Sequence, residues 1–189
     1  MPSLDQTLFL WINLGANAPS GLVWLARVIS QWLPTLALSG WLAALLLGPA
    51  RWRRALLVMG LAMALAWLGA HLVKDLVQVP RPYRLGLGKL WLPHAGGSGF
   101  PSSHTSVAMA LAVAAWRAPW PLAVRIGLLT LGPLMAWSRV AVGVHFAYDV
   151  LAAMLLGTLC AWLAWVAMTR LATRPRYAPV AAVSPPDRF

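Results

Sequence analysis

The chain has 189 residues, of which 60% are hydrophobic and only 10% are charged, whereas a soluble domain carries about 25% charged residues. So few charges exclude an ordinary soluble monomer and favour one compact domain of several membrane spans. The formal net charge of +11 does not indicate a nucleic-acid binder, because the arginines punctuate apolar runs and do not form a polar basic surface.

The first predicted elements lie before residue 48. Residues 4–17 carry apolar side chains at helical spacing but are too few to cross a bilayer, so they predict an amphipathic helix lying at the membrane interface. The chain start lacks the basic segment of a secretory signal. A turn-rich break over 13–21 then leads to the first predicted span, 22–47, which Pro34 can kink.

Four further helices are predicted along the rest of the chain, at 55–77, 102–116, 122–138 and 148–168. A loop rich in glycine and proline, 78–101, separates the first two of them. The fold class is therefore an all-α membrane protein with about five transmembrane helices and an N-terminal interfacial helix, a six-helix bundle. Residues 1–169 form the predicted membrane-embedded domain, and 170–189 a disordered cytoplasmic tail rich in arginine and proline.

The basic residues predict the orientation of these spans. One set falls on a single side of the bundle, which should be the cytoplasm by the positive-inside rule: Arg51, Arg53, Arg54, Arg117, Arg125 and the tail arginines. A second set breaks the rule at the outer face: Lys74, Arg81, Arg84, Lys89 and Arg139. A bound anion would explain why these cations lie at the outer face.

Three clusters of polar residues are predicted to meet at that outer face: Lys74 with Arg81-Pro82, Pro101-Ser102-Ser103-His104, and Ser138-Arg139 with His145 and Asp149. The second cluster stands where a loop becomes a helix, so backbone N–H groups and the positive end of the helix dipole can face an anion. His145 and Asp149 are four residues apart and share a face if the last helix begins at or before His145.

This set resembles the type-2 phosphatidic acid phosphatase superfamily, whose pattern is K-x6-R-P, P-S-G-H and S-R-x5-H-x3-D. Order and spacing match, and the one departure is Ser103 in place of glycine. Within the superfamily the chain is similar to the small bacterial undecaprenyl-diphosphatases, on the N-terminal stretch and on residues 96–104 and 138–145. The resemblance implies hydrolysis of undecaprenyl diphosphate through a phosphohistidine intermediate, at the outer face of the inner membrane, for cell-wall synthesis.

Physical chemistry assigns a role to each residue of the clusters. Phosphoryl transfer needs its oxygen charges neutralised, which Lys74, Arg81 and Arg139 can do without a metal, with further donors from Ser102 and Ser103. His145 is the candidate nucleophile and Asp149 orients it by accepting the Nδ1 proton. His104 is the candidate general acid and base. We expect Asp75 to be the only other carboxylate near the outer face, and therefore expect neither a metal site nor a cofactor.

Five other residues receive structural interpretations. His71 is expected to be a buried hydrogen-bond partner, Arg27 to reach the interface along its stem, and Arg84 and Lys89 to be solvated loop charges. The single cysteine, Cys160, allows no intramolecular disulfide and is expected to be a small buried hydrophobe.

Alternative functions stay open at this stage. The motifs identify the phosphate and not the lipid tail, so phosphatidylglycerophosphate, phosphatidic acid or lipid A phosphates remain candidate substrates, and a phosphotransferase remains possible. A transporter or channel selecting anions would not need His145 paired with Asp149. The partners are the bilayer and a lipid phosphate, with no nucleic acid, and the sequence does not indicate an oligomeric state. The short helix at 102–116 spans only about 22 Å against a hydrocarbon core of about 30 Å, which predicts a phosphate site sunk into the membrane edge.

Overall fold

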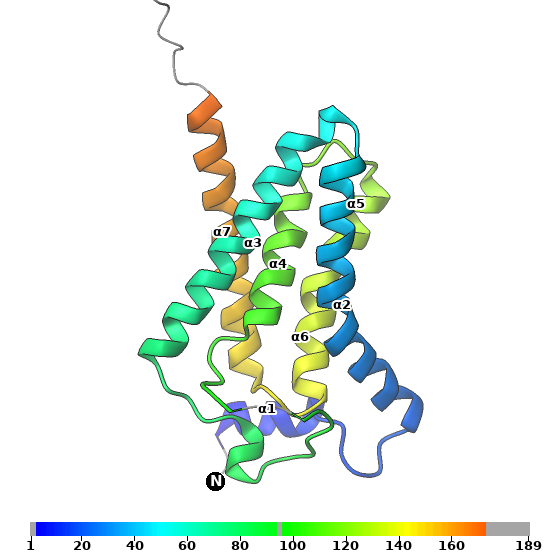
Figure 1. Ribbon diagram of the computed structural model, residues 1–189. Helices are drawn as coiled ribbons and strands as arrows, with labels where there is room; N and C mark the ends of the chain where they lie inside the picture. Colours follow the sequence, from blue (N-terminus) through cyan, green and yellow to red (C-terminus); the bar gives the residue numbers. More distant parts are fainter. Residues whose placement is uncertain (1–2, 94–95, 173–189) are drawn as a thin grey trace, which may run out of the picture.

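The computed structural model describes residues 3–93 and 96–172, and in this part of the chain every regular element is a helix (Figure 1). The α-helices are α1 (Leu4–Ile12), α2 (Ser20–Leu47), α3 (Arg53–Leu76), α4 (Ser103–Ala115), α5 (Leu122–Leu129), α6 (Leu131–Ala141) and α7 (Ala147–Ala172). Two short 3-10 helices lie at Ala50–Trp52 and Pro82–Leu85. The all-α prediction is confirmed. The predicted start of the disordered tail at residue 170 was too early, because α7 continues to Ala172. The rest of that tail lies outside the described residues.

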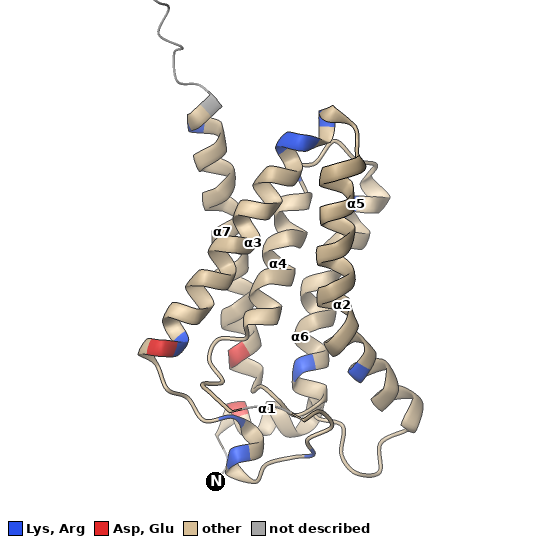
Figure 2. Cartoon of the chain, in the orientation of Figure 1, with Lys and Arg blue, Asp and Glu red and all other residues tan. Residues whose placement is uncertain are grey.

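The long helices form a bundle of apolar passes. Helices α2, α3 and α7 lie in segments long and apolar enough to cross a membrane, Ser20–Leu47, Ala50–Leu76 and Ala147–Leu171. Helix α4 and the α5–α6 pair run beside them along the bundle axis (Figure 1). Figure 2 shows the charged residues toward the two ends of the bundle, with none at mid-height in that view. Large apolar side chains cover its outside, such as Leu36, Leu46 and Leu155. The chain is a membrane protein.

The predicted fourth span, 122–138, was wrong as a single helix. The structure divides it into α5, which ends at Leu129, and α6, which begins at Leu131 and extends to Ala141. Pro133 gives the physical reason, because it has no N–H to donate to the carbonyl of Leu129, four residues earlier, and its ring crowds that carbonyl. At the break itself, the hydroxyl of Thr130 donates to the carbonyl of Gly127 at 2.7 Å.

Helix α4 lies at the centre of the bundle and packs against α3, α6 and α7. Its buried face is made of small residues, among them Ser106 and Ala110. A side chain at Gly157 of α7 would overlap the backbone at both positions. Glycine and alanine therefore let α4 and α7 approach closely, as membrane helices do when no water is present to drive their association. This close packing fixes the start of α4 beside the start of α7.

Helix α1 lies across one end of the bundle, at the end where α4 and α7 begin (Figure 1). Phe9 packs edge-to-face on Phe146 with ring centroids 5.4 Å apart. Asp5 accepts a hydrogen bond from the backbone N–H of Tyr148 at 3.0 Å, and the Asn13 amide donates to the carbonyl of Ala141 at 3.1 Å. Helix α1 thus holds the connection between α6 and α7 from outside.

Candidate active site

A cavity of about 360 Å³ lies inside the end of the bundle that α1 covers. The polar and charged side chains that line it are Lys74, Arg81, Ser103, His104, Arg139 and His145, with His71 on the same wall. They come from the end of α3, the loop after it, the start of α4, the end of α6 and the turn before α7. Residues from all three sequence clusters therefore meet in one cavity. The predicted site residues Ser102 and Asp149 do not line it.

His145 and Asp149 form a buried pair behind the cavity wall. Nδ1 of His145 lies 3.4 Å from Oδ2 of Asp149, and the two residues are only 1% and 2% exposed. The condition for a shared helix face is not met, since α7 begins at Ala147, close to the predicted start at 148, and His145 precedes it. The pair forms because Asp149 turns back over the helix start, where its Oδ2 accepts the N–H of Phe146 at 2.9 Å.

A tight turn at Gly143 lies between Arg139 and His145, which line the same cavity. Gly143 has φ of +85°, a conformation that residues with a side chain rarely adopt. The N–H of Gly143 donates to the carbonyl of Val140, and the N–H of Val144 donates to that of Arg139 at 3.2 Å. A Cβ at Gly143 would also overlap the carbonyl of Lys89. The turn therefore requires glycine for both conformation and space.

Arg81 is fixed by hydrogen bonds on all three of its guanidinium nitrogens. It donates to the carbonyls of Gly97, Ser98 and Val144 at 3.3, 3.0 and 3.0 Å, and Nη1 lies 3.3 Å from Nε2 of His145. Only 4% of Arg81 is exposed. Burial lowers its pKa below the usual value, but a guanidinium remains protonated in proteins. A fixed positive charge therefore stands next to the histidine.

Two further cations reach the cavity from α3 and α6. Nζ of Lys74 donates to Oγ of Ser103 at 2.6 Å. Nη1 of Arg139 donates to Oγ of Ser30 on α2 at 2.7 Å, while Nε of Arg139 is buried with no hydrogen-bond partner. An unsatisfied buried donor on a cation is a place where an anionic oxygen can be accommodated. The cavity thus presents three positive side chains to a ligand.

Ser102 does not take the position that the sequence suggested. Its N–H donates to the carbonyl of Asp149 at 3.2 Å, and its hydroxyl accepts a hydrogen bond from Thr105 at 3.1 Å. It is fully buried and makes no side-chain capping bond to α4. Ser102 therefore links the starts of α4 and α7, and Ser103 is the serine that lines the cavity. His104 is exposed and lines the cavity beside it.

Of the four polar residues that were expected to have structural roles only, one lines the cavity and three do not. His71 is half-buried on the cavity wall, with Nδ1 2.8 Å from the carbonyl of Trp67, so it is not fully buried as expected. Arg27, Arg84 and Lys89 are exposed and do not line the cavity.

Two serines that position the site were missed in the sequence. Ser30 binds Arg139, and Ser98 contacts Arg81 through its carbonyl while its hydroxyl accepts the N–H of Val79 at 3.1 Å. Ser30 stands in an apolar run without a motif. Ser98 lies inside the glycine-rich stretch before the second cluster, which was the one available signal.

An apolar helical bundle with three cations and a histidine–aspartate pair at one end defines a membrane protein with a site for an anionic group. The PAP2 superfamily model matches residues 55–172, and the chain belongs to this superfamily. It is accordingly a phosphatase. Its relatives include "Putative undecaprenyl-diphosphatase YbjG" of Escherichia coli (strain K12), 30% identical over 89% of this chain and 86% of that protein. Undecaprenyl-diphosphatase BcrC of Bacillus subtilis (strain 168) is 30% identical over 65% of this chain and 62% of BcrC.

Solved structures share the fold. LpxE of Aquifex aeolicus superposes with a TM-score of 0.75 at 22% identity, over 87% of this chain and 96% of LpxE. The first transmembrane PAP2 type phosphatidylglycerolphosphate phosphatase from Bacillus subtilis superposes with a TM-score of 0.64 at 20% identity, over 92% of this chain and 87% of that one.

Proposed function

We propose that this phosphatase removes the terminal phosphate of undecaprenyl diphosphate, giving undecaprenyl phosphate, the lipid carrier of cell-wall synthesis. The observation that carries the proposal is one cavity lined by three cations and by His145, whose Nδ1 faces the buried carboxylate of Asp149. The names of the two relatives, both undecaprenyl-diphosphatases, support the choice of substrate.

In the first step Nε2 of His145 attacks the terminal phosphorus. A P–N bond forms while the P–O bond to the bridging oxygen breaks. His104 donates a proton to the leaving oxygen of the lipid monophosphate. Asp149 accepts a hydrogen bond from Nδ1–H of His145 and stabilises the positive charge that the ring gains. The phosphate oxygens compete with His145 for the Arg81 guanidinium, which frees Nε2 for attack.

In the second step water hydrolyses the phosphohistidine. His104 takes the proton of the attacking water, a P–O bond forms, the P–N bond breaks, and inorganic phosphate leaves. Lys74, Arg81 and Arg139 neutralise the equatorial oxygens in both steps, a role that cationic side chains perform in phosphoryl transfer. Ser103 adds a hydroxyl donor, and Ser102 acts indirectly by holding the start of α4.

The surroundings of the cavity suit a lipid substrate. A second cavity of about 530 Å³ shares four apolar residues with the first, Leu33, Ala37, Leu111 and Leu131. It continues along α2 past Gly40 toward the opposite end of the bundle, and its walls are almost entirely apolar. A diphosphate among the cations would therefore have an apolar groove beside it for its hydrocarbon tail.

We further propose the placement of the enzyme in the bacterial inner membrane, with the active site outside and the C-terminus in the cytoplasm. The arginines around the 3-10 helix Ala50–Trp52 and the α4–α5 turn, at the end away from the cavity, support this orientation through the positive-inside rule. Helix α4 has 13 residues, which is about 20 Å against a hydrocarbon core of about 30 Å. The cavity at its start thus lies below the headgroup plane. The chain up to the end of α7 at Ala172 acts as one membrane-embedded domain.

The test is phosphate release by the purified protein, with EDTA present, from a panel of lipid phosphates. The panel contains undecaprenyl diphosphate, phosphatidylglycerophosphate, phosphatidic acid and lipid A phosphates. We expect the highest kcat/KM on undecaprenyl diphosphate and an acid-labile phosphoenzyme that His145→Ala does not form. A tenfold preference for another lipid would replace the substrate, and full activity of His145→Ala would refute the mechanism.

A further inference from the structure

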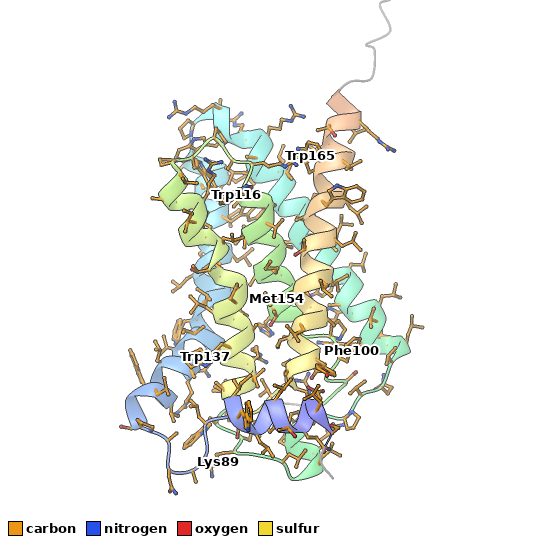
Figure 3. The ribbon with its side chains drawn as sticks, turned by 180° about the vertical axis from the view of Figure 1, so that it is seen from behind. Lys89, Phe100, Trp116, Trp137, Met154 and Trp165 are labelled. Carbon is orange, nitrogen blue, oxygen red and sulfur yellow. The ribbon has the colours of Figure 1, made fainter. Side chains whose placement is uncertain are left out.

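The end of the bundle opposite the candidate active site carries a second concentration of positive charge. Figure 2 shows Lys and Arg at this end and the acidic residues of the described chain toward the other end. These are Asp75 at the end of α3, Asp149 at the start of α7 and, beyond the sequence expectation, Asp5 on α1. Figure 3 places Trp116 and Trp165 at this end, and Lys89 and Phe100 toward the other. The charge here belongs to a separate surface, on which the proposed reaction does not depend.

Three arginines line one cavity of about 300 Å³ at this end, Arg51 and Arg54 near the start of α3 and Arg117 after α4. The described residues around this cavity include no carboxylate. Three like charges without a counter-charge repel one another, and the repulsion is strongest where water is scarce. A bound anion would relieve it.

The orientation of Arg117 is fixed by an aromatic side chain. Its guanidinium carbon lies 3.7 Å from the ring centroid of Trp165 on α7, within the range of a cation–π contact. The N–H groups of a guanidinium lie in its own plane, so a guanidinium over an aromatic ring keeps them available to phosphate oxygens. Arginines that only set the orientation of the protein in the membrane would need neither the contact with Trp165 nor a shared cavity.

An apolar cavity continues from the arginine-lined one. It has a volume of about 190 Å³ and shares Val58, Ala114, Arg117 and Trp165 with it. From there it follows the outside of α7, where Thr158 and Trp162 are exposed along its wall. The combined shape is a cationic head site joined to an apolar groove on the flank of α3, α4 and α7.

We propose that this site binds an anionic phospholipid at the membrane face opposite the active site. The phosphate contacts Arg51, Arg54 and Arg117, and one acyl chain lies in the groove past Thr158. A free anion would use only the head site, whereas a phospholipid uses both parts, and basic pockets between membrane helices are suited to lipid headgroups. The proposal goes beyond the phosphatase activity and does not depend on its substrate.

The head site is tested by the melting temperature of the purified full-length protein in detergent, with added phosphatidylglycerol, phosphatidylcholine or inorganic phosphate. We expect phosphatidylglycerol alone to raise Tm, by about 5 °C near saturation. The double variant Arg54→Gln/Arg117→Gln should lose this rise. Arg53→Gln, an exposed neighbour outside the cavity, should keep it. An equal rise with phosphatidylcholine or with phosphate alone, or an equal loss in Arg53→Gln, would overturn the proposal.

The groove is tested with all arginines in place, which also covers the case in which the double variant does not fold. Thr158→Phe adds a ring at an exposed position on the groove wall and should halve the rise or abolish it. Leu159→Phe adds a ring at the next residue, which is exposed but does not line the groove, and should respond like the wild type. Equal responses of these two variants would refute the lipid and its acyl chain as the occupant.

Discussion

The guanidinium of Arg81 lies 3.3 Å from Nε2 of His145, and this contact determines which nitrogen of the ring carries the proton. A guanidinium donates hydrogen bonds and accepts none, so Nε2 must be the acceptor. The proton is then on Nδ1, where Asp149 faces it at 3.4 Å. The resting site thus holds His145 in the tautomer that a nucleophile needs.

The first prediction concerns Asp149, whose carboxylate faces Nδ1 of His145. Asp149→Asn keeps the shape of the side chain, and its amide oxygen can still accept the N–H of Phe146. Because Oδ2 makes both contacts, this amide oxygen also faces Nδ1, but the variant lacks the negative charge that stabilises the positive ring formed when Nε2 attacks. We expect kcat to fall by about 10²- to 10⁴-fold, as when the aspartate of a catalytic triad is changed. Phosphate release under saturating substrate measures it.

The melting temperature provides the control for Asp149→Asn. The variant should melt within a few degrees of the wild type, because its backbone bonds are retained. A variant that keeps more than half of its kcat would show that the reaction does not depend on the negative charge of Asp149.

The second prediction concerns the turn that joins the two parts of the third cluster. Gly143→Ala forces a side chain into the left-handed region and against the carbonyl of Lys89. We expect the free energy of unfolding to fall by about 1–3 kcal/mol, together with most of the activity, because Arg139 and His145 move apart. Gly127→Ala on α5, where a Cβ meets nothing within 4 Å, is the matched control and should change stability by less than about 1 kcal/mol. Equal stabilities of the two variants would contradict the requirement for glycine at position 143.

The sequence could predict the helices and the members of the site, but not every helix end. Periodic apolar residues predicted 22–47 and 55–77, and α2 and α3 differ from these ranges by at most two residues at each end. Pro133 was visible, yet a proline inside a membrane helix can produce either a kink or a break. Which of the two occurs depends on the packing of α6 against α4, which no local pattern contains.

The detailed geometry of the site depends on contacts between distant parts of the chain. The motif spacing indicated that His145 and Asp149 belong together, and the predicted range 148–168 placed His145 before the last helix, but the turn at Gly143 that positions His145 was not predicted. Ser30 is 109 residues from Arg139, and one serine in an apolar span carries no sign of such a partner. Ser102 and Ser103 are adjacent and identical in type, so the sequence could not tell which of them lines the cavity.

The third prediction tests Ser30 as the residue that positions Arg139. Ser30→Ala removes the hydroxyl that accepts from Nη1 of Arg139 at 2.7 Å. If Arg139 then holds the phosphate less well in both the ground and the transition state, KM rises while kcat is nearly unchanged. We expect a three- to tenfold rise in KM, equivalent to roughly 1 kcal/mol. Ser30→Thr keeps a hydroxyl and should restore most of the affinity. A lower melting temperature with an unchanged KM would limit Ser30 to a role in stability.

The last prediction places the lipid tail in the apolar groove along α2. Gly40 lines this groove and a Cβ there meets nothing within 4 Å, so Gly40→Phe fills it without disturbing a packed neighbour. We expect kcat/KM on undecaprenyl diphosphate to fall about tenfold, the equivalent of 1.4 kcal/mol of lost binding. A short-chain diphosphate, whose tail ends before the groove, should be hydrolysed within about twofold of the wild-type rate, because the phosphate site is unchanged. Gly127→Phe on α5, outside the groove, should leave both substrates unaffected. An equal loss on the long and the short substrate would exclude the groove as the tail site.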